Sequence, residues 1–145
     1  MVITKLDAAR IQLDAAIEHF FQGNHICAVT LAGAAEDIFS GLLKSNGKQS
    51  AFEFLYDWYQ QAYNTTISKS DFSRKKANQA RNWLKYADDD TDTKYDILKQ
   101  DSIMMLMRAL PSYHKLTKSH TEMMERFFQY LKANIDEINA LFEPT

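Results

Sequence analysis

The stretch at residues 25–44 constrains the fold most, because a helix built from it is apolar on nearly every side. Such a helix has to lie inside the protein with other helices around it. Its small residues, among them Ala32 and Gly33, would let neighbouring backbones come close. Glu36 and Asp37 are the only acidic residues within it. We therefore predict a central helix at residues 25–44.

A second predicted helix, at residues 3–22, precedes the central one after a very short link. Its apolar residues recur at helical spacing from Leu6 to Phe20. Gly23 is suited to end this helix, and Asn24 is suited to cap the next one. Because short links join antiparallel neighbours, we expect these two helices to form an antiparallel pair.

The rest of the chain also follows helical spacing, and no stretch alternates apolar and polar residues for long enough to predict a strand. Ser50 with Glu53, and Ser119 with Glu122, have the spacing of a capping box, so we expect helices to start there. Pro111 falls inside a helical pattern and predicts a kink or a break. We predict an all-α fold, an antiparallel up-and-down bundle of five or six helices forming a single domain over residues 1–145. The helices are expected at 3–22, at 25–44, from 50, at 70–87, from 93 and at 119–142.

Composition excludes several classes of protein. The net charge of −2 excludes a generally basic nucleic-acid binder, although it leaves room for a local basic face. Cys27 is the single cysteine, so no intramolecular disulfide is possible, which fits a reducing compartment. No uninterrupted apolar run reaches the roughly 18 residues of a membrane span. We expect a soluble cytoplasmic protein without a membrane partner.

Residues 78–92 combine charged residues, aromatic residues and residues typical of a turn. The packing of a hydrophobic core does not require this combination. Arg81, Asn82, Lys85 and Tyr86 follow one another within about a turn and a half of the predicted helix, and four aspartates come next. This pattern indicates a phosphate-contacting site. The structural alternative is that these are polar positions of an amphipathic helix, with Arg81 paired to an acid of the central helix such as Glu36 or Asp37. Other basic residues near these positions are Lys69, Arg74 and Lys75.

Metal and cofactor sites are not expected. Asp88, Asp90 and Asp92 occupy the first three odd positions of a calcium loop. However, Thr93 stands where such a loop needs glycine, and Lys99 stands where it needs glutamate. The four histidines share no metal-ligand spacing, and no phosphate-binding loop or nucleophile motif occurs.

Two segments resemble the HEPN superfamily of small helical bundles: residues 13–38, and the run Ala80-Arg-Asn-Trp-Leu-Lys-Tyr86. The resemblance covers roughly the first two-thirds of the chain. Active members of the family cleave RNA without a metal, and they use a motif contributed by two chains across a dimer interface. That motif is an arginine, usually followed by a polar residue, with a histidine four to six residues after the arginine. The resemblance therefore implies a homodimer with an RNA or nucleotide ligand.

Arg81 and Asn82 match the first two positions of the motif, and Tyr86 stands where the histidine is expected. Metal-free cleavage needs a group that takes a proton from the 2′-hydroxyl and returns one to the leaving oxygen, which histidine does well near neutral pH. Tyrosine ordinarily does not, because its reference pKa is about 10. The candidate catalytic residues are therefore Arg81 and Tyr86, and the candidate ligand-binding residues are Arg81, Asn82, Lys85 and Tyr86.

Three functional hypotheses follow from these patterns. The first is an HEPN-like homodimeric module without catalysis, or with weak catalysis, that binds RNA, a nucleotide or a protein, with Arg81 facing a groove. The second is a metal-independent ribonuclease that uses Arg81 of two chains. The third is a protein-interaction domain without a nucleic-acid ligand, whose aromatic residues on the helix from Ser50, such as Trp58, bind a partner.

Overall fold

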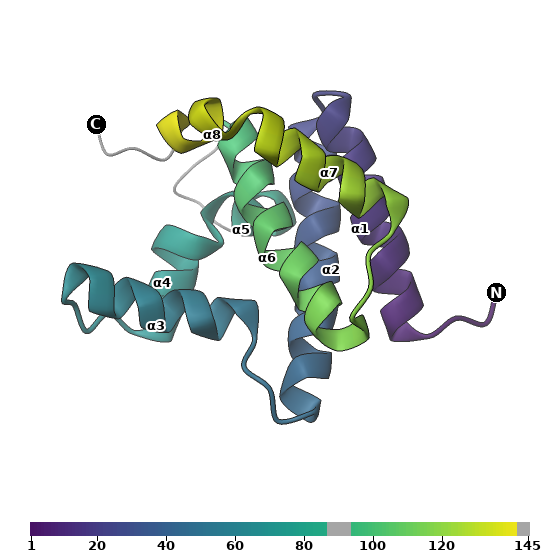
Figure 1. Ribbon diagram of the computed structural model, residues 1–145. Helices are drawn as coiled ribbons and strands as arrows, with labels where there is room; N and C mark the ends of the chain where they lie inside the picture. The colour runs from purple at the N-terminus through teal and green to yellow at the C-terminus, as the bar shows by residue number, and fades with distance from the viewer. Residues whose placement is uncertain (87–93, 142–145) are drawn as a thin grey trace.

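The computed structural model describes residues 1–86 and 94–141, and every regular element in those residues is helical (Figure 1). The predicted all-α class is therefore confirmed. This part of the chain contains eight α-helices and one π-helical turn instead of five or six helices, because two of the expected helices are divided. The elements are α1 (Lys5–Phe21), α2 (His25–Ser45), α3 (Ala51–Tyr63), α4 (Lys69–Phe72), η1 (Ser73–Ala77), α5 (Gln79–Lys85), α6 (Lys99–Thr117), α7 (Glu122–Ala133) and α8 (Ile135–Leu141).

α1 and α2 form the antiparallel pair that the short link predicts (Figure 1). Gly23 has a φ of 77°, a left-handed conformation that glycine adopts without steric cost. The Asn24 side chain then caps α2 by accepting a hydrogen bond from the Cys27 N–H at 3.3 Å. The link between the two helices is therefore limited to residues 22–24.

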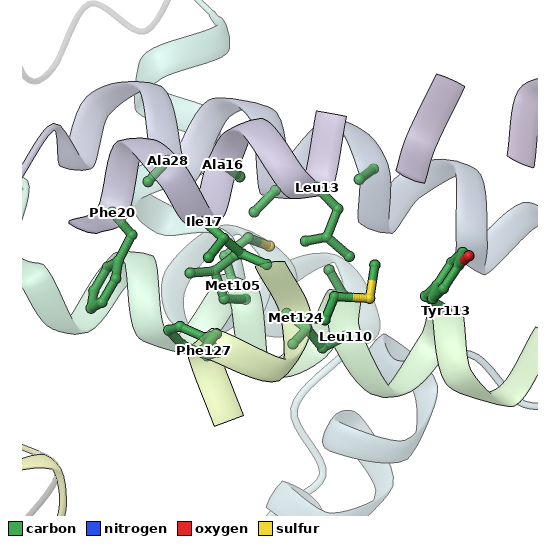
Figure 2. Packing of buried hydrophobic residues seen from close by; sticks show 14 of the residues in the cluster. Leu13, Ala16, Ile17, Phe20, Ala28, Met105, Leu110, Tyr113, Met124 and Phe127 are labelled. Atoms are coloured by element: carbon green, nitrogen blue, oxygen red, sulfur yellow. The ribbon is translucent and has the colours of Figure 1, made fainter. Parts of the chain in front are cut away.

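The core lies between α1, α2, α6 and α7 (Figure 2). Phe20 of α1 and Phe127 of α7 meet edge to face, with ring centroids 5.4 Å apart. α6 runs beside α2 in the same direction (Figure 1), so these two neighbours do not alternate as an up-and-down bundle requires. Fully buried side chains of the core include Leu13, Ile17, Phe39, Leu106, Leu110 and Phe127.

The helix expected at residues 70–87 is divided into α4, η1 and α5. Asn78 is the C-cap of η1, and its backbone N–H donates to the Ser73 carbonyl at 2.8 Å. The Asn78 amide also donates to Ser73 Oγ at 2.7 Å and accepts from Arg108 of α6 at 2.7 Å. A contact with α6 therefore holds this break, and apolar spacing along the chain cannot reveal such a contact. Lys76, which directly precedes the end of η1, is exposed.

α6 passes through Pro111 and continues to Thr117, so the predicted break into two helices is not found. Proline removes one backbone hydrogen bond, but Pro111 lies on the solvent side of α6, where water can satisfy the freed carbonyl. α6 also begins later than predicted, at Lys99, and residues 94–98 precede it without helical structure.

The last predicted helix begins later and is also divided. Thr121, and not Ser119, is the N-cap of α7, because Thr121 Oγ accepts from the Met124 N–H at 3.2 Å. Thr121 additionally donates to Asp14 of α1 at 2.6 Å, which anchors the start of α7 to the bundle. The backbone of Asn134 (φ −124°, ψ 27°) leaves the helical conformation and separates α7 from α8.

α2 is long enough to cross a membrane, and its mean hydropathy of 1.5 is also high enough. The core helix of a folded bundle meets the same two criteria. α2 packs along α1 and α6, and its Ala28, Ala32 and Phe39 are fully buried among them. These neighbours account for the apolar character of α2.

Replacing Phe127 by alanine is expected to lower the free energy of unfolding by about 3–5 kcal/mol, because the ring is fully buried and its loss leaves a cavity. Phe54→Ala is the matched control, since the Phe54 side chain is 64% exposed. The control should change stability by no more than about 0.5 kcal/mol. Urea denaturation of the two variants measures both values. Equal losses would contradict this placement of the core.

Candidate functional site

Arg81 lies directly against the backbone of α2 at Gly33. A Cβ atom at Gly33 would be 2.6 Å from Arg81 Cδ and 2.9 Å from Arg81 Cγ. The aliphatic part of Arg81 therefore occupies the space that a side chain at position 33 would need. Only 15% of the Arg81 side chain is exposed.

The guanidinium of Arg81 reaches both acids of α2. Arg81 Nη1 is 2.8 Å from Asp37 Oδ1 and 3.7 Å from Glu36 Oε2. The structural alternative for Arg81, pairing with these acids, is therefore what the structure shows. The pairing with half-exposed Asp37 is a short charge-assisted hydrogen bond, and it neutralises the group that was expected to contact phosphate.

Glu36 is shared between two arginines and is only 1% exposed. Arg108 Nη2 lies 3.1 Å from Glu36 Oε2, and Ser40 Oγ donates to Glu36 Oε1 at 2.9 Å. Arg108 is itself 7% exposed and also donates to Asn78 Oδ1 at 2.7 Å and to the Ala77 carbonyl at 3.1 Å. Burial lowers the pKa of Arg108, while the negative charge of Glu36 raises it and offsets part of that effect.

Arg108 was not identified from the sequence as part of this site. A lone arginine in an amphipathic pattern resembles an ordinary surface residue. The available signal was its position, because Met104 and Met105 stand one turn before it and Arg108 therefore continues an apolar stripe along the helix. An arginine inside such a stripe requires a buried acid as its partner.

Asn82, Lys85 and Tyr86 have surroundings that differ from those of Arg81. Asn82 is half-buried, whereas Lys85 is exposed and the Tyr86 side chain is 50% exposed. Lys85 Nζ lies 5.3 Å from the centroid of the Tyr86 ring, a cation–π arrangement. The structure therefore brings Lys85 and Tyr86 together at the end of α5 and turns Arg81 toward α2.

The space beside Arg81 is small. A cavity of about 50 Å³ is lined by Arg81 together with Tyr95 and Asp101. Since one water molecule takes about 30 Å³ in the liquid, this cavity has room for solvent and not for a nucleotide. We expected Arg81 to face a ligand groove. Its guanidinium is instead paired with Asp37 and Glu36 of α2.

No group of three or more histidine, cysteine, aspartate or glutamate side chains could hold a metal ion within residues 1–86 and 94–141. The aspartates at 88, 89, 90 and 92, which gave the partial calcium-loop pattern, lie outside the described residues.

His25 and Ser102 form a pair that resembles part of a nucleophilic site but cannot act as one. His25 Nδ1 and Ser102 Oγ are hydrogen-bonded at 3.0 Å. Ser102 is fully buried, so no substrate reaches its hydroxyl. Burial lowers the pKa of His25, the charge of Lys99 lowers it further, and Asp101 raises it. The pair joins the start of α2 to the start of α6.

The lowered pKa of His25 predicts a loss of stability in mild acid. Around and below the ordinary histidine pKa of 6.5, the unfolded chain binds a proton at His25 more readily than the folded chain does. Protonation therefore favours unfolding, and the free energy of unfolding should fall as the pH decreases from about 7.5 to 5.5. Urea denaturation at several pH values measures this slope.

His25→Gln should flatten that slope, because glutamine does not titrate. His19→Gln is the matched control at the other end of the same turn, and it should leave the slope in place. An unchanged slope in His25→Gln would assign the pH dependence to other groups.

Gly33→Ala is expected to lower the free energy of unfolding by about 1–3 kcal/mol, because the new methyl group collides with Arg81. Gly41→Ala on the same helix is the matched control, since a Cβ there meets nothing within 4 Å. That control should gain up to about 1 kcal/mol from helix propensity. In an Arg81→Ala background the loss at position 33 should disappear, and urea denaturation of all four variants tests this. If the two glycine substitutions behave alike, the contact between Arg81 and Gly33 is wrong.

Comparisons with protein-family models, with curated proteins and with solved structures give no match for this chain.

Proposed function

We propose that the protein is an HEPN-like helical bundle that binds RNA or a nucleotide without cleaving it and acts as a homodimer. The support in the sequence is the resemblance of residues 13–38 and 80–86, which includes Arg81 and Asn82. The departure from the family at Tyr86 supports the absence of catalysis, because no histidine is available there as a proton carrier.

The observation that carries the proposal is an exposed basic strip along α4, η1 and α5. The strip is defined by Lys69, Arg74, Lys75, Lys76 and Lys85, which are all exposed. In a chain with a net charge of −2, the segment from 69 to 85 contains a single acid, Asp71. Clustered cations on one segment are the electrostatic signature expected of a site that follows a phosphate backbone.

Lys75 and Lys76 are the members of the strip most available to phosphate. Arg74 is engaged by Asp71 at 2.9 Å. Neither Lys75 nor Lys76 forms an ion pair with any residue in the described part of the chain. Two exposed lysines therefore offer six ammonium N–H donors to phosphate oxygens.

Tyr86 offers a surface for a base. Its ring is half-exposed at the end of α5, and the Lys85 ammonium lies beside it. Single-stranded nucleic acids bind proteins by stacking bases on such rings while cations hold the phosphates. In this proposal Arg81 has a supporting role, since its contacts with Gly33 and Asp37 position α5 on α2.

Binding of a labelled single-stranded RNA, followed by fluorescence anisotropy at low salt, tests the proposal. Lys75→Glu together with Lys76→Glu should weaken binding about tenfold or more and reduce the slope of log K against log salt by about 0.7 for each lost phosphate contact. Tyr86→Ala should weaken binding by roughly fivefold or more through the lost stacking. Lys5→Glu with Lys132→Glu is the matched control, with the same change in charge on exposed positions of α1 and α7. Equal losses in both double variants would reduce the effect to net charge and overturn the site.

An RNA-cleavage assay with EDTA separates binding from catalysis. The unmodified chain and Arg81→Ala are both expected to leave RNA intact. Cleavage by the unmodified chain that Arg81→Ala abolishes would replace this proposal with the metal-independent ribonuclease. Cleavage gained only in Tyr86→His would support a scaffold that lacks its proton carrier. Sedimentation of the free protein tests the homodimer, and a stable monomer would contradict that part.

A further inference from the structure

α3 has two apolar faces, and only one of them is covered by the described residues. Three of its rings pack around Phe72 of α4 with centroid distances between 5.0 and 5.7 Å; they belong to Phe52, Tyr56 and Tyr59. On another side of the helix Phe54 and Trp58, one turn apart, are 64% and 52% exposed. No residue of α3 is fully buried, and α3 and α4 stand out from the packed helices (Figure 1).

The uncovered face of α3 forms one wall of a groove of about 620 Å³ between α3 and α6. The facing wall consists of Met104, Met107 and Pro111, which repeat at helical spacing along α6. Met104 is 36% exposed and Met107 is 48% exposed. Aromatic side chains and methionine are enriched at the centres of protein interfaces, and methionine adapts its shape to the partner. This groove is distinct from the basic strip on α4, η1 and α5.

We propose that this groove binds an amphipathic helix of a partner protein, with apolar side chains against Trp58 and Met107 and an acidic side chain beside Lys115. The shape of the groove supports a helix as the occupant. Both walls are helices, and a third helix fits between them by packing its ridge of side chains into their grooves. The part of α3 that lines the groove, from Ala51 to Trp58, gives the wall a length of about 12 Å, which matches about two turns of a bound helix.

The charge of the groove supports an acidic partner. Its lining contains two cations, Arg108 and Lys115, and no acid. Arg108 is already engaged by Glu36 at 3.1 Å and is almost completely buried. Lys115 is exposed and donates one hydrogen bond, to the Gln49 carbonyl at 3.1 Å, so its ammonium has donors left for a carboxylate. A partner helix with an acid at the Lys115 end would complete this site.

A displayed library of helical peptides, about as long as the 13 residues of α3, tests the proposal. The library varies one apolar face and the charges at both ends, and it is selected on the full-length protein. Selected peptides should carry apolar residues at positions i, i+3 or i+4 and i+7, with an acid at one end. Trp58→Ala and Met107→Glu should each weaken a selected peptide about tenfold or more. Lys115→Glu should weaken the acidic peptide and strengthen its variant with lysine in place of the acid.

Ile26→Ala is the matched control, because Ile26 is 55% exposed on α2 outside the groove. All these positions are exposed, so circular dichroism should show unchanged helix content in every variant. Selection of no peptide, or of peptides whose binding is unchanged by Trp58→Ala and Met107→Glu, would overturn the proposal.

A dimer that dissociates in the Met107→Glu variant would also overturn it, since a second copy of the chain would then occupy the groove. Tight binding of a small amphiphile such as lauric acid that competes with the peptides would assign the groove to small molecules instead. RNA binding should be unaffected by Trp58→Ala, so this proposal and the RNA proposal can fail separately.

Discussion

The buried carboxylate of Glu36 determines how α2, α5 and α6 meet. A carboxylate that is almost inaccessible to water needs a cation close by, and Arg108 of α6 supplies it at 3.1 Å. Arg81 of α5 contributes a second, more distant cation at 3.7 Å. A buried ion pair adds little net stability compared with apolar packing. We therefore assign the network a positional role, because its contacts form only when one turn of each helix faces Glu36.

The sequence predicts the α1–α2 pair well because the information is local there. Gly23 follows α1 in a left-handed backbone conformation, and Asn24 caps α2 through its own side chain. The apolar surface of α2 requires this helix to be buried among the others. The division of the helix at 70–87 could not be predicted in this way. It depends on Asn78 being held by Arg108, a residue 30 positions later in the chain. Apolar periodicity reports which face is buried, and it contains no information about which polar residues meet across helices.

The candidate site could be predicted only in part, because the sequence shows which acids are available to Arg81 and does not show which residues meet across helices. The acids that pair with Arg81 are adjacent in the only acidic step of α2, so Glu36 and Asp37 could be named beforehand. The small residue Gly33 was interpreted as allowing close backbones, whereas it accommodates the aliphatic part of Arg81. The cations of this protein consequently fall into two groups. Arg81 and Arg108 pair with acids of α2, and the lysines of η1 remain exposed on the surface.

The parallel course of α2 and α6 also affects how the chain reaches its fold. α1 and α2 are joined by a few residues, so they can associate soon after either helix forms. α6 can pack on α2 only after residues 46–98 have been closed into a loop, and the entropy lost in that closure is compensated only by contacts made afterwards. Until α6 arrives, the side of the α1–α2 hairpin that α6 will cover is therefore exposed to water. The longer this hairpin waits for α6, the more readily its apolar side can associate with other chains and aggregate.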